Sequence, residues 1–239
     1  MKFSVNQKDL QNSLNYCQGV VEKRSTLPIL SNVLLEAKSE NLKITATDLD
    51  LIFIQNISNI EIVQEGETTT SCSIMYDIVR KFNNEKKVNF NLVSENKINL
   101  ESDKSSFNLN CLKASEFPIT ESNFNENKFS LNSKKLLKLL NKCKFSISND
   151  ETRHYLSGIF LHLTDNEDKK FLTAVATDSH RMAISKTLLS EEINFEPVIL
   201  PKKTIFQLCS LPDDYDGDVK ISNVKTKIKF EFNNIILIS

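Results

Sequence analysis

The chain has little glycine and no tryptophan. Only four glycines occur among its 239 residues, at positions 19, 66, 158 and 217. They lie too far apart to form a glycine-rich phosphate loop or a Gly-x-Ser-x-Gly nucleophile turn. The sequence therefore lacks the motifs of common nucleotide-binding folds and of serine hydrolases.

Paired cysteines and long apolar runs are also missing. The five cysteines are scattered with no Cys-x-x-Cys pair, which favours buried free thiols in a reducing compartment. No run approaches the roughly 18 apolar residues of a membrane span. Met1 leads directly into the strand-like Lys2–Val5 rather than into a signal peptide. We expect a cytoplasmic protein without a membrane anchor, a bound metal or another cofactor.

An internal repeat is the most informative feature that is present. Ser31–Leu35 returns as Ser157–Leu161, 126 positions later, and Ala46-Thr47-Asp48 returns as Ala176-Thr177-Asp178, 130 positions later. A nearly constant offset predicts one fold built twice. Two unrelated domains are the alternative, but they would not explain the offset.

Apolar spacing predicts two helices in each copy, separated by short strands and polar turns. The predicted stripes are Leu10, Leu14, Cys17 and Val21; Ile74, Ile78 and Phe82; Leu136, Leu139, Leu140 and Cys143; and Ile205, Leu208 and Cys209, in a helix opening at Pro201. Strands are expected at 33–35, 42–45, 88–92, 98–101 and 107–111. The fold class is α+β, with two helices packed on antiparallel sheets in each domain. We place the domains at 1–113 and 131–239, joined by a polar linker at 114–130.

Positive charge is concentrated in the predicted helices. The windows 6–20, 73–82, 133–144 and 201–210 carry charges of 0, +1, +5 and +2, although the whole chain carries −1. Lys134, Lys138 and Lys142 follow one another at four-residue spacing, on the helix face away from the leucines. Such a face suits phosphate contacts. Ordinary solvated helix faces in a lysine-rich protein are the alternative.

An enzymatic interpretation would start from Asp178 and His180, which point the same way on a strand, with Asp48 or His162 as a third group. The chain has only three histidines, and no Ser-His-Asp order or paired carboxylates stand out. We expect a non-catalytic protein.

Several motifs carry a resemblance to a known family. They include Arg24–Leu30, Ser115–Pro118, Arg153–Gly158, Val175–Ala183 and Val198–Lys202. Over essentially its whole length the chain resembles the bacterial DNA polymerase III beta subunit, the replicative sliding clamp. The combination of Arg-x-Tyr-Leu with Ala-Thr-Asp-x-His-Arg is highly specific.

The resemblance implies a ring of repeated DNA-clamp domains, with helices lining the hole and sheets outside. Duplex DNA would pass through without sequence-specific contacts while the ring tethers the polymerase for processive replication. The implied partners are double-stranded DNA, the polymerase catalytic subunit, the clamp loader and other clamp-binding proteins, which insert short peptides. Full-length members of the family also self-associate.

The resemblance also assigns DNA contacts. An arginine after the first helix matches Arg24, beside Lys23, although pairing of Arg24 with Glu22 is the alternative. The loop before the second domain's first strand matches Asn149, Asp150, Arg153, His154 and Tyr155. Here Asn149-Asp150 replaces a frequent His-Gln, and Asp150 would weaken phosphate contact. The basic helix windows add Arg80, Lys134, Lys138, Lys142 and Lys202.

The peptide site of the family matches Leu156, Thr177, Ser179, His180, Arg181 and Met182. Leu and Met supply adaptable apolar walls for several partners. Ser179 replaces the usual Gly. In the first copy, Asp48-Leu49-Asp50 stands at the corresponding place without His-Arg, so the two copies differ where one is expected to function.

The family's third domain has no counterpart in the chain, which stops at Ser239. Half of the peptide pocket is then expected to be missing, as is the surface that the edge at Phe107 and Leu109 would meet in a dimer. We expect either a sliding-clamp subunit or a truncated, non-ring-forming fragment. A trimer of two-domain chains is a third hypothesis.

Overall fold

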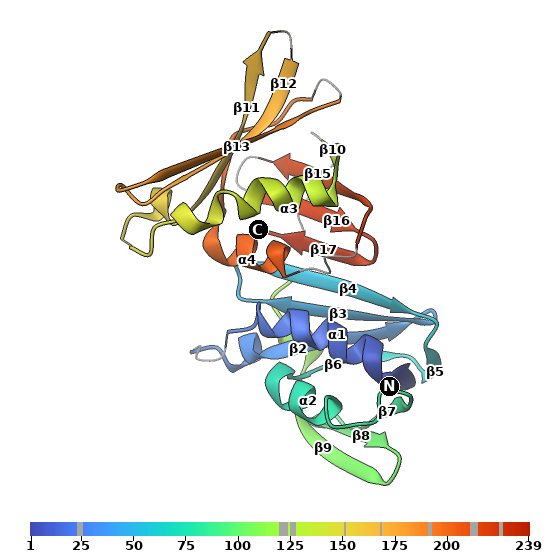
Figure 1. The fold of residues 1–239 in the computed structure, drawn as a ribbon. Coiled ribbons are helices and arrows are strands. Elements are labelled where there is room, and N and C mark those ends of the chain that lie inside the picture. Colours follow the sequence, from blue (N-terminus) through green and yellow to red (C-terminus); the bar gives the residue numbers. More distant parts are fainter. Residues whose placement is uncertain are drawn as a thin grey trace. The chain divides into compact units, whose positions relative to one another are not determined.

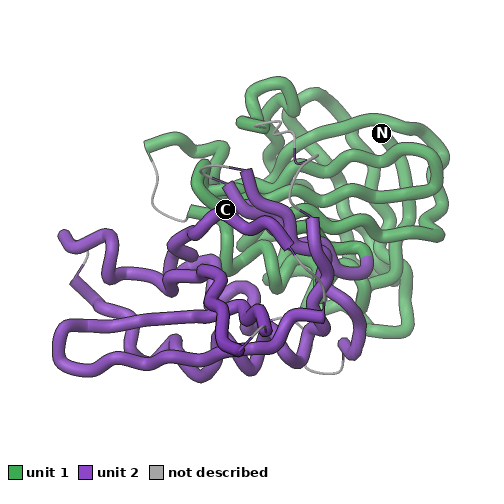
Figure 2. Tube along the Cα trace, turned by 90° about the horizontal axis from the view of Figure 1, so that it is seen from above, with its two compact units in different colours: residues 1–121, 234–236 green, residues 122–233, 237–239 purple. Residues whose placement is uncertain are grey.

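A computed structural model describes residues 1–22, 26–119, 124, 128–150, 152–167, 169–190, 193–210, 215–224 and 227–239. The chain divides into two compact units (Figure 2). Unit 1 comprises residues 1–121 and 234–236, and unit 2 comprises residues 122–233 and 237–239. Each unit is considered by itself below.

Unit 1 places two α-helices against antiparallel strands (Figure 1). Its elements are β1 (Lys2–Asn6), α1 (Gln7–Gln18), the 3-10 turn η1 (Pro28–Ser31), β2 (Asn32–Lys38), β3 (Asn41–Thr47), β4 (Ile52–Ser58), β5 (Glu61–Gln64), β6 (Gly66–Ser71), α2 (Cys72–Val79), β7 (Lys87–Ser94), β8 (Lys97–Ser102), β9 (Ser105–Leu112) and η2 (Ala114–Glu116). The strands follow the order β4-β3-β2-β6-β9-β8-β7-β1-β5.

Unit 2 repeats this plan. Its elements are β10 (Lys128–Asn132), α3 (Ser133–Asn141), η3 (Lys144–Ser146), η4 (His154–Leu156), β11 (Gly158–Asn166), β12 (Lys169–Thr177), β13 (Met182–Leu188), β14 (Val198–Pro201), α4 (Lys202–Cys209), β15 (Asp218–Val224), β16 (Lys227–Phe232) and β17 (Ile235–Ile238). The strands form the orders β13-β12-β11-β14 and β10-β15-β16-β17.

The predicted repeat and the α+β fold class are confirmed. Strand, helix, three strands, one further strand, helix and three strands follow one another in unit 2, and unit 1 has the same order with β5 added before β6. The strand pairings are antiparallel. The five predicted strand segments of the first copy all lie within strands of unit 1. One element differs: β5 pairs with β1 in unit 1, whereas no described strand takes that place beside β10.

Three of the four predicted helix stripes, those of α1, α3 and α4, lie mainly on buried faces. Leu10, Leu14 and Cys17 on α1 are fully buried, although Val21 lies beyond the end of the helix. Leu136, Leu139 and Leu140 are buried on α3, whose first turn is capped by the side chain of Asn132 accepting from the Lys134 N–H.

The predicted stripe of α2 is wrong at Ile74, although Phe82, beyond the end of the helix, is buried. Cys72, Met75 and Val79 are its buried residues, whereas Ile74 is 53% exposed. Helix α2 spans only eight residues and is apolar on more than one side, so spacing alone could not select the face that packs against α1. In α4, Ile205 and Leu208 are buried as predicted, while Cys209 is only partly buried. Pro201 ends β14 and occupies the N-cap position without a side-chain bond, and the helix begins at Lys202.

The predicted division at 1–113 and 131–239 stays a prediction. Within the predicted linker, η2 forms at Ala114–Glu116 and β10 begins at Lys128. Phe117 is buried in a cluster with Ile29, Leu30 and Leu34 of unit 1. The polar composition of 114–130 therefore hid two ordered segments that belong to the units themselves.

The cysteines that the structure describes are free thiols, and four of the five are buried. Burial raises the pKa of the Cys17 and Cys111 thiols, which keeps them protonated. Of the described helices, none combines the length and apolar character that a membrane crossing requires.

Candidate functional site

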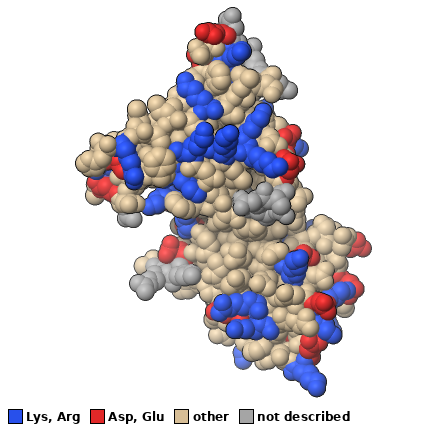
Figure 3. All heavy atoms as spheres, viewed as in Figure 1, with Lys and Arg blue, Asp and Glu red and all other residues tan. Residues whose placement is uncertain are grey.

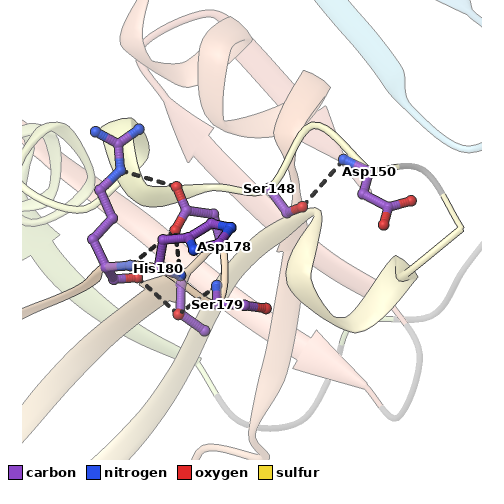
Figure 4. Close-up of polar contacts among 7 residues, drawn as sticks. Ser148, Asp150, Asp178, Ser179 and His180 are labelled. Carbon is purple, nitrogen blue, oxygen red and sulfur yellow. Dashed lines mark hydrogen bonds and ion pairs between the residues drawn. The ribbon is translucent and has the colours of Figure 1, made fainter.

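Five of the six predicted peptide residues, all except Leu156, lie in the tight turn between β12 and β13, here called the Thr177–Met182 turn (Figure 4). The Asp178 carboxylate accepts from the backbone N–H groups of His180 and Arg181, both at 3.0 Å, and from the Arg181 Nε at 2.9 Å. Thr177 Oγ1 accepts from the Ser179 N–H and donates to the Arg181 carbonyl. These bonds fix the backbone, so His180, Arg181 and Met182 are presented outward.

The role of Asp178 in this turn argues against its use in acid–base catalysis. The Arg181 and His180 N–H bonds to the carboxylate lower the pKa of Asp178 below its ordinary value. Both carboxylate oxygens are therefore engaged within the turn itself. His162 lies elsewhere, stacked on Phe160 with ring centroids 4.7 Å apart.

Unit 1 contains the same turn with other side chains. Thr47 Oγ1 accepts from the Leu49 N–H, and Asp48 accepts from the N–H groups of Asp50 and Leu51. The third residue has a left-handed backbone in both turns, with φ of 86° at Leu49 and 77° at Ser179. Glycine suits this conformation best, and the matching bonds in the two units show that Leu49 and Ser179 also adopt it.

The loop before β11 is tied to the Thr177–Met182 turn by Arg153. The Arg153 Nε lies 2.7 Å from an Asp150 carboxylate oxygen, and its Nη1 donates to Ser179 Oγ at 3.0 Å. The Thr152 hydroxyl and Arg153 lower the pKa of Asp150. Asp150, which sequence reasoning treated only as a weakness for phosphate binding, thus orients Arg153 toward the turn.

Tyr155 and Leu156 belong to the same loop, in the 3-10 turn η4. Leu156 is partly buried in η4, and its carbonyl accepts from the Ser148 N–H at 3.0 Å. A Cβ at Gly158 would lie 2.2 Å from the Leu200 carbonyl oxygen, so only glycine allows the chain to pass from η4 into β11 beside β14. Tyr155 is 67% exposed.

Exposed apolar side chains accompany the turn. Met182 is 64% exposed and Phe145 is 58% exposed, and the Arg181 guanidinium lies 5.5 Å from the centroid of the Phe145 ring. Phe145 was not predicted as a site residue, and its exposure and its contact with Arg181 assign it to this surface. An apolar surface beside cationic groups can bind a short peptide with apolar anchors.

The basic face predicted on α3 is solvent-exposed. Figure 3 shows lysine side chains gathered over this helix in unit 2. Lys134, Lys138 and Lys142 are exposed, while the leucines on the other face are buried. Lys134 pairs with Asp216 at 2.6 Å, so its charge is partly balanced. Among the described residues, Lys138 and Lys142 have no ion pair and can contact phosphates.

The other predicted DNA contacts are dispersed. Arg80 pairs with Asp77 at 3.0 Å in unit 1. Lys202 Nζ donates to Asn149 Oδ1 at 2.6 Å in unit 2, which brings two of the predicted contacts together. Lys23 and Arg24 lie outside the described residues.

Of the predicted subunit-interface residues, Phe107 is 42% exposed and Leu109 is buried. Strand β9 pairs with β8 along its length, but with β6 only at Cys111 and Leu112.

In the part of the chain that the structure describes, no three His, Cys, Asp or Glu side chains are grouped as metal ligands would be.

Comparison with known proteins places these features in one family. The model of the N-terminal domain of the DNA polymerase III beta subunit matches residues 1–121, and the model of its central domain matches residues 130–239. The chain belongs to the DNA polymerase III beta subunit family. The resemblance inferred from the motifs is thereby confirmed.

Relatives in this family are beta sliding clamps. The chain is 33% identical over 242 residues to that of Caulobacter vibrioides and 36% identical over 243 residues to that of Rickettsia felis. It is matched along its whole length but spans only 64% and 62% of those proteins. A solved DnaN sliding clamp from Bartonella birtlesii, bound to griselimycin, superposes with a TM-score of 0.93 at 34% identity, with 64% of that chain covered.

Proposed function

We propose that the chain is a non-catalytic sliding-clamp subunit. It would act in the cytoplasm, encircling duplex DNA together with further clamp domains and tethering the replicative polymerase. The observation that carries the proposal is the Thr177–Met182 turn. In a chain of this family, unit 2 exposes His180, Arg181 and Met182 on a backbone fixed by hydrogen bonds. The same turn in unit 1 lacks these side chains.

The peptide site is proposed at Leu156, Thr177, Ser179, His180, Arg181 and Met182, with Phe145 and Arg153 added. Its partners would be the polymerase catalytic subunit, the clamp loader and other proteins that carry a short peptide with apolar anchors. Asp178 and Arg153 hold the turn and the adjoining loop before a peptide arrives, which reduces the entropy lost on binding.

Griselimycin can serve as a probe because a solved relative is bound to it, and variants of this chain test whether it binds at the proposed site. We expect calorimetry to detect binding by the chain and at least a tenfold loss in Met182→Glu, which places a charge among the apolar contacts. Leu49→Glu is the matched control, since it changes the same turn in unit 1 and should leave the affinity within twofold. Equal losses in both variants would contradict the proposal.

The DNA contacts are proposed at the exposed face of α3, with the loop residues Asn149, Arg153 and Tyr155 and with Lys202 contributing. Lysines hold a duplex by point charges to phosphate and do not read bases. This suits a protein that has to move along DNA without stopping at particular sequences.

Fluorescence anisotropy with two duplexes of unrelated sequence tests this assignment. We expect equal affinities for both duplexes and at least a fivefold loss in the double variant Lys138→Glu with Lys142→Glu. A control with the same charge change in unit 1, Lys2→Glu with Lys97→Glu, should bind more tightly than the α3 variant. A preference for one duplex, or equal losses in the two variants, would refute it.

A further inference from the structure

The edge of β10 differs from that of its counterpart β1. The two strands have almost the same sequence, Lys2-Phe3-Ser4-Val5-Asn6 and Lys128-Phe129-Ser130-Leu131-Asn132. β1 lies between β7 and β5, whereas among the described residues β10 pairs with β15 alone. An edge that is covered in unit 1 is therefore left unpaired by every described strand of unit 2.

The backbone groups on this open edge can be assigned. The Ser133 N–H donates to the Gly217 carbonyl, as the equivalent Gln7 N–H donates to Lys86. Because antiparallel strands alternate the direction of their backbone groups, the odd-numbered residues of β10 face β15. Lys128 and Ser130 then direct their N–H and C=O groups outward, where a further strand can pair with them.

A groove of about 580 Å³ runs along this strand. All five residues of β10 line it, together with the segment Leu188–Ser190 and Ile193. Ser222 of β15 also lines it, is only 1% exposed, and has no hydrogen-bond partner for its hydroxyl among the described residues. A buried hydroxyl without a partner is costly, so a ligand able to hydrogen-bond there would be favoured.

Among the described residues that line the groove, the charges are mainly positive. Lys128, Lys135 and Lys220 line it, and none of them has an ion pair among the described residues. Of the acidic groups, Glu231 is paired with Lys229 at 3.1 Å, which leaves Asp218. In unit 1 the strand at the equivalent place, Glu61-Ile62-Val63-Gln64, begins with a carboxylate bonded to Lys87.

We propose that the β10 groove binds an extended peptide of another protein, which adds a strand to β10 as β5 does to β1. The peptide would alternate acidic and aliphatic residues. Main-chain hydrogen bonds to Lys128 and Ser130 provide the affinity, and the lysines select the acidic residues. The site involves none of the residues of the Thr177–Met182 turn, so it is independent of the peptide site proposed above.

The chain itself supplies a probe. A capped peptide with the sequence of residues 59–65, Asn-Ile-Glu-Ile-Val-Gln-Glu, reproduces the strand that covers β1. In the free ¹⁵N-labelled chain we expect fast amide hydrogen exchange at Ser130. Saturating peptide should slow that exchange at least tenfold and shift the resonances of β10, while a peptide with lysine in place of every glutamate should not bind.

Variants separate the backbone from the charges. Ser130→Pro removes the outward N–H and should lower peptide affinity at least tenfold, whereas Ser130→Ala keeps the N–H and should stay within twofold. Lys135→Glu should lower the peptide affinity about fivefold. This variant keeps the proposal testable if the proline variant fails to fold. Met182→Glu should bind the probe normally, which separates this test from that of the griselimycin site.

Three outcomes would overturn the proposal. Slow exchange at Ser130 in the free chain would show that the chain's own residues already pair with the edge. Protection that rises with protein concentration would assign the edge to a second copy of the chain. Shifts confined to the Thr177–Met182 turn would place the probe at the other site.

Discussion

At the scale of single residues, the left-handed position of the two matching turns has a measurable cost. Leu49 and Ser179 both adopt positive φ, which costs a residue with a Cβ about 1–2 kcal/mol. Leu49→Gly should therefore raise the free energy of unfolding by up to about 1 kcal/mol, after the greater flexibility of glycine in the unfolded chain is deducted. Urea unfolding measures this.

Ser179→Gly should gain less than Leu49→Gly, because Ser179 Oγ accepts from Arg153 and this bond would be lost. A larger gain at Ser179 would show that the hydrogen bond contributes nothing. Ser179→Val should destabilise, since a β-branched residue is strongly disfavoured at positive φ.

Asp178 should make the turn sensitive to acid. Its pKa is lowered in the folded protein from the ordinary 3.8, so its contribution is fully present above that value and is lost as the pH falls through the lower folded value. Amide resonances of His180 and Arg181 should shift on acidification below about pH 4. Asp178→Asn should remove this shift, and an unchanged titration in the variant would assign it to another group.

At the scale of elements, α2 separates a buried face from an exposed one. Met75→Ala should cost about 2–5 kcal/mol because it leaves a cavity, and Ile74→Ala should cost less than about 0.5 kcal/mol at an exposed site. Thermal unfolding distinguishes the two variants. A greater loss for Ile74→Ala would mean that α2 packs by the stripe that spacing predicts.

The same helix shows where sequence reasoning ends. Long stripes such as that of α1 identify their own buried face, and the internal offset identifies the repeated fold. A short helix with apolar residues on several sides gives no such signal, so its buried face depends on the elements packed around it. The proposed peptide residues followed from the motif, but the bond from Arg153 to Ser179 joins residues that are 26 positions apart and was not predicted from spacing.

Pairing at a strand edge is equally hidden in the sequence. β1 and β10 are nearly identical pentapeptides, and yet only β1 is covered on both sides by described strands. Local sequence predicts that a segment is a strand, but the neighbours of that strand are chosen by the rest of the fold. The β10 groove could therefore be found only in the structure.

At the scale of the whole molecule, a net charge of −1 conceals a concentration of lysine on α3. Association with DNA should weaken as salt rises, because each contacted phosphate releases counterions. Reversing Lys138 and Lys142 together should reduce the slope of log affinity against log salt by about 2, one for each lost contact. Titrations over a range of salt concentrations measure the slope, and a slope that does not change would remove these lysines from the interface.

The duplicated turn suggests a way to move a binding specificity from one place to another. Its backbone is fixed by a threonine and an aspartate in both units, while the following positions hold Leu49-Asp50 in one unit and Ser179-His180 in the other. Side chains at those two positions can be exchanged while the backbone of the turn stays the same. The residue after them is less free, since Leu51 is buried where Arg181 is exposed. Evolution, or an engineer, could thus revise the recognition surface by rewriting side chains without redesigning the loop beneath them.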